Sequence, residues 1–143
     1  MKQQSILGQL QAHAIAIISL IVAITALTYT TWREEQTEKN RNIRLAAFEV
    51  LKNLGELQIV VNYAHYESEN SMGNPVLGWG HIALIGDLSE LLPLPIPEAS
   101  KKLVATWSKT WSTLKTNEEN TLLISNEIDK VRTDTLSILQ KLR

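Results

Sequence analysis

The stretch from Ala12 to Trp32 reads Ala-His-Ala-Ile-Ala-Ile-Ile-Ser-Leu-Ile-Val-Ala-Ile-Thr-Ala-Leu-Thr-Tyr-Thr-Thr-Trp, and it decides how the chain is organised. No Asp, Glu, Lys or Arg occurs from Gln3 to Trp32. At ~1.5 Å per helical residue the stretch spans about 30 Å, the thickness of the hydrocarbon core of a bilayer. Tyr29 and Trp32 end it with amphipathic rings, which favour the headgroup level. The sequence therefore predicts an N-terminal transmembrane anchor over residues 1–32.

A cleaved signal peptide is the alternative for this segment. It agrees less well with the sequence, because only Lys2 and the amino terminus supply positive charge before the apolar run. The run is also long for a signal peptide, and no convincing small-x-small cleavage site precedes Trp32. A buried core helix is disfavoured because every face of the segment is apolar or small. We expect an uncleaved, single-pass anchor whose first partner is the lipid bilayer.

The charges that flank the anchor bear on its orientation. Lys2 stands on the N-terminal side, and Arg33, Lys39, Arg41 and Arg44 stand on the C-terminal side. The positive-inside rule therefore favours a cytoplasmic position for the soluble domain. The glutamates between these cations, and the ability of long domains to cross regardless of charge, leave the periplasmic side open.

Small residues recur along the anchor at spacings of 4, 3, 4, 3 and 4: Ala12, Ala16, Ser19, Ala23, Ala26 and Thr30. We call this set the small-residue seam. Helices associate in lipid through close backbone approach, which small side chains permit. The seam therefore predicts association with another membrane helix or with a second copy of the chain. The alternative is that alanine is simply common in membrane helices.

The remainder, residues 33–143, is expected to be one helical bundle domain. Residues 33–44 contain neither Gly nor Pro, so the anchor should run directly into a stalk and core helix over 33–69. Apolar residues at helical spacing form its core stripe: Ile43, Ala47, Val50, Leu54, Leu57, Val61 and Ala64. Phe48, Leu51 and Val60 are expected to widen this stripe.

This first part of the chain resembles a group of known sequences. The residues that carry the resemblance are Tyr29-Thr-Thr-Trp32-Arg33-Glu-Glu-Gln, then Asn40-Arg41-Asn42, followed by the amphipathic helix. Over residues 15–60 the chain is similar to small, uncharacterised single-pass bacterial membrane proteins. The resemblance implies a location in the bacterial inner membrane, and it implies no activity.

The second half of the chain is also read as helical. Turn chemistry in Gly73-Asn74-Pro75 and Gly78-Trp79-Gly80 predicts a loop over 70–80, followed by a short helix over 81–92 and a proline linker over 93–97. Helices over 98–116 and 117–143 should follow, the second opened by a capping box from Thr116 to Glu119. One long helix bent near Thr116 is the alternative. Trp107 and Trp111, one turn apart, are expected to fill the core, with a contact to the membrane surface or a partner as the alternative.

No segment alternates as a strand does. The predicted fold class is therefore all-α, with an N-terminal transmembrane helix continuous with a stalk helix and followed by an antiparallel helical bundle.

Composition argues against several kinds of chemistry. The net charge of −1 gives no basic excess for nucleic acid, and the lack of Cys excludes thiolate metal sites. The three His residues do not recur at metal-ligand spacing, and no nucleophile or phosphate-loop motif occurs. We expect no enzyme activity, no cofactor and no metal. The preferred function is a membrane-anchored adaptor or accessory subunit that acts through protein–protein association.

One group of residues is typical of a binding site. Tyr63, His65 and Tyr66 end the stalk and core helix, and Trp79 and His81 follow across the predicted loop. If the loop folds back, these five residues form an aromatic patch able to form hydrogen bonds. The alternative function is therefore a sensory or ligand-binding bundle with its site in the 63–81 region. In the simpler reading, Tyr63 and Trp79 cap the core and the histidines are solvated.

Overall fold

The computed structural model describes residues 6–67 and 71–142, with side chains from His13 onward. The elements in these ranges are α1 (Ile6–Tyr66), α2 (Pro75–Ser89), α3 (Ile96–Thr110) and α4 (Glu118–Lys141), with short 3-10 helices at Ser71–Gly73 and Trp111–Thr113. No strand occurs in these ranges, so the predicted all-α fold, with a long N-terminal helix followed by a bundle, is confirmed. The chain divides into two compact units, Met1–Lys39 and Asn40–Arg143, and α1 contributes to both.

In the first unit, every described side chain from His13 to Lys39 is exposed. The hydroxyls of Thr25, Thr28 and Thr31 each donate to the carbonyl four residues earlier, at 2.8, 2.8 and 3.0 Å. These bonds leave few polar groups unsatisfied in an apolar surrounding. The helix contains an 18-residue window with mean hydropathy 2.0 and no buried residue. By length and composition it is able to cross a membrane.

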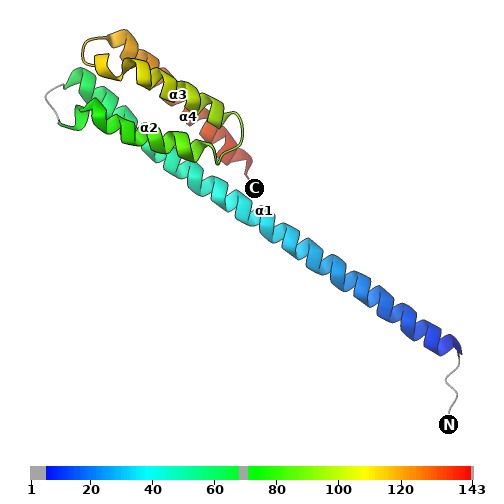
Figure 1. Ribbon diagram of the computed structural model, residues 1–143. Helices are drawn as coiled ribbons and strands as arrows, with labels where there is room; N and C mark the ends of the chain where they lie inside the picture. The colour runs from blue at the N-terminus through cyan, green and yellow to red at the C-terminus, as the bar shows by residue number, and fades with distance from the viewer. Residues whose placement is uncertain (1–5, 68–70, 143) are drawn as a thin grey trace. The chain divides into compact units, whose positions relative to one another are not determined.

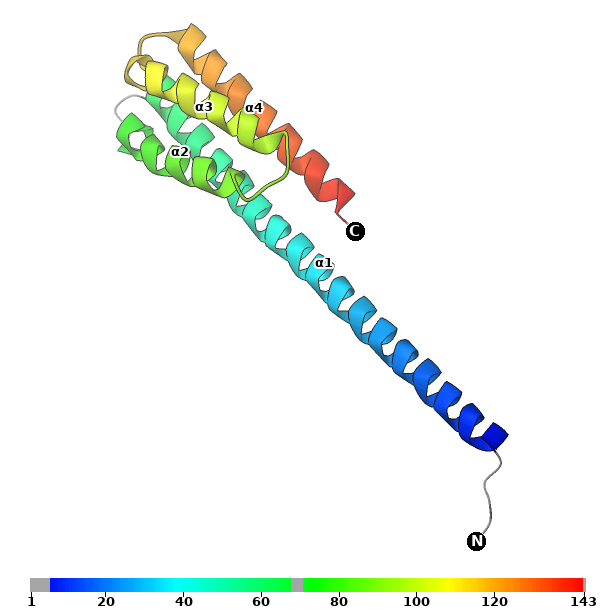
Figure 2. The same ribbon diagram turned by 45° about the vertical axis from the view of Figure 1, so that its right-hand side comes forward.

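In the second unit, the four helices lie side by side with alternating directions, as Figures 1 and 2 both show. Two hydrogen bonds join α1 to the C-terminal part of the chain in antiparallel order. Arg44 Nη2 donates to the Leu142 carbonyl at 2.9 Å, and Gln58 Nε2 donates to Ser125 Oγ at 3.1 Å. The Ser100 hydroxyl of α3 donates to the Ile85 carbonyl of α2 at 3.4 Å. Each helix therefore packs antiparallel to its neighbour.

The predicted core stripe of α1 is the centre of the core. Val50, Leu57 and Val61 are fully buried, and Ile43 packs partly buried against the same cluster. The prediction for Phe48 is wrong, because its side chain is 59% exposed. On a helix with ~100° per residue, Phe48 lies about 160° from Val50, so it faces away from the core.

The helix α2 begins earlier than predicted, at Pro75 rather than His81. The Asn74 side chain accepts a hydrogen bond from the Val76 backbone N–H at 3.0 Å, and Pro75 takes the first helical position, where its missing N–H costs nothing. Most of the predicted loop over 70–80 is therefore helix. The helix ends at Ser89, three residues before the predicted end at Leu92. Residue 70, and residues 68 and 69 of the predicted stalk and core helix, lie outside the described residues.

Two helices, not one, follow the proline-rich connector. The helix α3 begins at Ile96, so Pro97 belongs to its first turn, and it ends at Thr110 rather than 116. The residue that caps α4 is Asn117, whose side chain accepts from the Asn120 backbone N–H at 3.2 Å. The predicted capping box at Thr116 is therefore wrong by one residue, because the Asn117 amide oxygen accepts the bond from the first turn and takes the cap position.

Candidate functional site

The small-residue seam lies in the first unit. Its described members are exposed: Ala16, Ser19, Ala23, Ala26 and Thr30. The side chain of Ala12 is outside the described residues. The Thr30 hydroxyl donates to the Ala26 carbonyl at 3.0 Å, and this bond keeps the Thr30 side chain against its own helix. The described part of the seam therefore offers a narrow, low surface at which another helix backbone can approach closely.

The structure divides the predicted aromatic patch. The His65 ring packs edge to face on the Tyr66 ring, with centroids 4.7 Å apart, whereas Trp79 and His81 contact residues outside the patch. His65 Nδ1 lies 3.1 Å from the Leu114 carbonyl, and because a carbonyl oxygen only accepts, the imidazole is the donor. The Trp79 ring packs edge to face on Trp107 and Trp111, with centroids 6.4 and 6.2 Å apart. His65 therefore joins α1 to the turn that follows Thr113, and Trp79 joins α2 to the end of α3 and the 3-10 helix after it.

The fifth member of the predicted patch, His81, is also held by a helix contact. His81 Nδ1 lies 3.0 Å from Asn53 Oδ1, and Asn53 Nδ2 donates to the Glu49 carbonyl at 2.9 Å. Because Asn53 is buried, this pair satisfies a polar group inside the interface between α1 and α2. The pair therefore links α1 to α2 through a polar contact.

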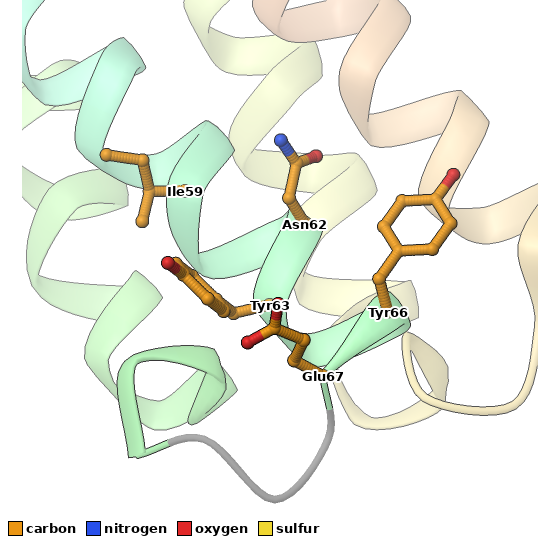
Figure 3. Close-up of a pocket in the computed structure, with 5 residues that line it drawn as sticks. All are labelled: Ile59, Asn62, Tyr63, Tyr66 and Glu67. Carbon is orange, nitrogen blue, oxygen red and sulfur yellow. The ribbon is translucent and has the colours of Figure 1, made fainter.

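Tyr63 and Tyr66 do meet at a shared feature, a shallow hollow of about 310 Å³ on the last turns of α1. Its lining residues are Ile59, Asn62, Tyr63, Tyr66 and Glu67 (Figure 3). His65, Trp79 and His81 are not among them. The rings of Tyr63 and Tyr66 extend to either side of Asn62 in Figure 3. The hollow is open, and it is formed by one end of one helix.

Large apolar side chains are exposed on both α1 and α2 of the second unit. On α1 they include Leu45, Phe48 and Ile59, and on α2 they include Leu77 and Leu84. Of these three residues on α1, only Phe48 has a predicted position, in the core, and the predictions do not include Leu45 or Ile59. For α1 the helical spacing of the sequence already predicts this exposed surface, because Leu45, Phe48 and Ile59 lie on the side opposite the core stripe.

The described residues contain no group of three or more His, Cys, Asp or Glu side chains able to hold a metal ion. Comparisons with protein families, with curated proteins and with solved structures find no match for this chain. The fold and surfaces described above therefore define the class: a helical protein with one N-terminal helix long and apolar enough to cross a membrane.

Proposed function

We propose that the protein is a single-pass, membrane-anchored helical adaptor or accessory subunit of a bacterial inner membrane, which acts by association with other proteins and not by catalysis. The observation that carries the proposal is the apolar segment of α1, in which no residue of an 18-residue window is buried by the chain itself. A helix that is apolar on all sides needs an apolar surrounding, which a bilayer provides. The bundle is assigned to the cytoplasmic side, which follows the Lys and Arg count around the anchor.

Association through the anchor is tested by adding bulk to the small-residue seam. The variant Ala16→Leu, Ser19→Leu, Ala23→Leu keeps the segment apolar but prevents close backbone approach. We expect about a tenfold loss of crosslinked complexes of the full chain in membranes, which corresponds to ~1.4 kcal/mol. The measurement is chemical crosslinking followed by gel analysis.

A matched control adds the same bulk on the opposite side of the anchor. At ~100° per residue, Ala14, Thr25 and Thr28 lie well away from the seam, and all three are exposed. The variant Ala14→Leu, Thr25→Leu, Thr28→Leu should crosslink as the wild type does. Equal losses in the two variants would show that added bulk anywhere disturbs the anchor, and the seam would then have no special role.

The hollow beside Tyr63 and Tyr66 is the observation that favours the second candidate, a sensory or ligand-binding bundle. Its lining combines aromatic rings with an amide and a carboxylate, which are groups that orient small molecules. The Tyr66 side chain is exposed, so Tyr66→Ala should leave the bundle folded. If the bundle binds a small molecule at this hollow, the bound molecule raises the melting temperature of the wild type but not of Tyr66→Ala.

A further inference from the structure

The side of α1 opposite the core stripe carries an apolar surface. Leu45, Phe48, Ile59 and Tyr66 are exposed there, and a Cβ built on Gly55 meets no atom within 4 Å. Positions 45, 48, 52, 55, 59, 62 and 66 follow one another at alternating spacings of three and four, which is the a and d pattern of a heptad repeat. We call these seven positions the outward face of α1.

We propose that the outward face of α1 pairs with the same face of a second copy of this chain, in a parallel, left-handed coiled coil. The proposal rests on the proposed function, because it names one partner for the association. It does not use the small-residue seam, and all seven positions belong to the second unit.

The heptad pattern separates the two sides of the helix. With positions 45, 52, 59 and 66 as a and positions 48, 55 and 62 as d, the f positions are Val50, Leu57 and Ala64. All three f residues are fully buried in the bundle. In an ordinary coiled coil the f position faces water, so here α1 presents one side to its own bundle and the opposite side to a partner.

The hollow in Figure 3 has the geometry that a coiled coil requires. A knob in a coiled coil enters a hole formed by four residues of the facing helix, at i, i+3, i+4 and i+7. Four of the five residues that line the hollow, Ile59, Asn62, Tyr63 and Tyr66, have this spacing. In a parallel pair with the assignment above, the side chain that enters it is Asn62 of the second copy.

Charges beside the outward face are complementary between two parallel copies. Arg44 occupies a g position and Glu49 the following e position, the pair that meets across a parallel coiled coil, and Arg44 Nη2 also donates to the Leu142 carbonyl of its own chain. Lys52, at an a position, already lies 3.8 Å from Glu49 of its own chain. A charged residue at a weakens pairing but helps to fix register, so the face suits reversible association rather than a permanent dimer.

Membrane anchoring favours the parallel arrangement. Two copies held in one bilayer by the same N-terminal segment have α1 helices with the same chain direction. Confinement to the membrane also raises their effective concentration, so a modest pairing energy gives a substantial dimer population. These two effects favour a second copy over an unrelated soluble helix as the occupant.

Disulfide crosslinking tests the proposal directly, because the chain contains no Cys. Single variants Phe48→Cys and Ile59→Cys place a thiol on the outward face, and Leu122→Cys places one at a similarly exposed site on α4. In oxidised membranes that contain the full chain, we expect about tenfold more disulfide-linked dimer at positions 48 and 59 than at 122. Because these residues are exposed, the variants should keep the wild-type helix content, which circular dichroism checks.

Each possible result of the crosslinking supports or overturns the proposed pairing. Equal crosslinking at all three positions would mean random collision and would overturn the proposal. If no disulfide dimer forms while a lysine-reactive crosslinker still joins the wild type to other proteins, self-pairing is wrong and the adaptor function stands. If no crosslinked species of any kind forms, both are wrong.

A second variant is designed to strengthen the pairing, whereas the cysteine variants only detect it. Lys52→Leu in the Phe48→Cys background removes a charge from an a position and should increase the disulfide-linked dimer several-fold. Lys52→Glu in the same background keeps a charge at that position and should give no increase. If Lys52→Leu leaves the dimer yield unchanged, position 52 does not lie in an interface between copies.

Discussion

Replacing Trp107 with alanine is expected to lower the free energy of unfolding of the bundle by about 3–5 kcal/mol. The Trp107 side chain is fully buried, and its ring meets the Trp79 ring edge to face with centroids 6.4 Å apart. Removing the ring leaves a cavity between α2 and α3 that the surrounding helices fill only in part. Urea denaturation of the full chain in detergent, followed by circular dichroism, measures the loss.

Trp107→Phe is the control for this prediction. It keeps most of the ring and removes Nε1, a buried donor with no hydrogen-bond partner among the described residues. Losing an unsatisfied donor offsets part of the lost packing, so the phenylalanine variant should be clearly more stable than the alanine variant. A Trp107→Ala protein as stable as the wild type would contradict the central position of this residue in the core.

Gly78→Ala should destabilise the bundle by about 1–3 kcal/mol, the cost of an extra carbon in a filled core. A Cβ at Gly78 would overlap the six-membered ring of Trp107, which is itself fully buried. The ordinary gain of about 1 kcal/mol for Gly→Ala in a helix is therefore reversed at this position. The same denaturation experiment measures the change.

Gly80 is the matched control, two residues later on the same helix. A Cβ there meets no atom within 4 Å, so Gly80→Ala should raise the stability by up to about 1 kcal/mol. The changes in unfolding free energy expected at Gly78 and Gly80 have opposite signs because only Gly78 lies on the side of α2 that faces α3. Equal effects at the two positions would mean that α2 packs on α3 through another face.

The core of the fold was predictable because it depends on local spacing. Val50, Leu57 and Val61 recur at helical intervals, and a helix with that pattern buries one side. The start of α2 was not predictable in the same way. Gly78-Trp79-Gly80 has the composition of a turn, but a helix forms there because Asn74 caps it and Gly78 allows Trp107 to pack closely. Gly78–Trp107 is a long-range contact, which local composition does not reveal.

The candidate surfaces were predictable only in part. Tyr63 and Tyr66 are three residues apart and share a side of α1, whereas His65 is rotated by ~200° from Tyr63 and reaches the Leu114 carbonyl. Helical geometry alone therefore separates His65 from Tyr63, although the His65 ring still packs edge to face on the neighbouring Tyr66 ring. Phe48 is apolar and close to the core stripe in sequence, but its position on the helix, about 160° from Val50, already predicts that it faces away from the core.

Membrane anchorage is the central claim, and alkaline carbonate extraction of cell membranes tests it most directly. The measurement follows the full-length chain by a C-terminal tag and compares it with the Val22→Arg, Ile24→Arg variant, whose two charges oppose insertion. We expect the wild type to stay in the membrane pellet and the variant to move substantially into the supernatant. A wild-type chain that is released by carbonate would contradict the account.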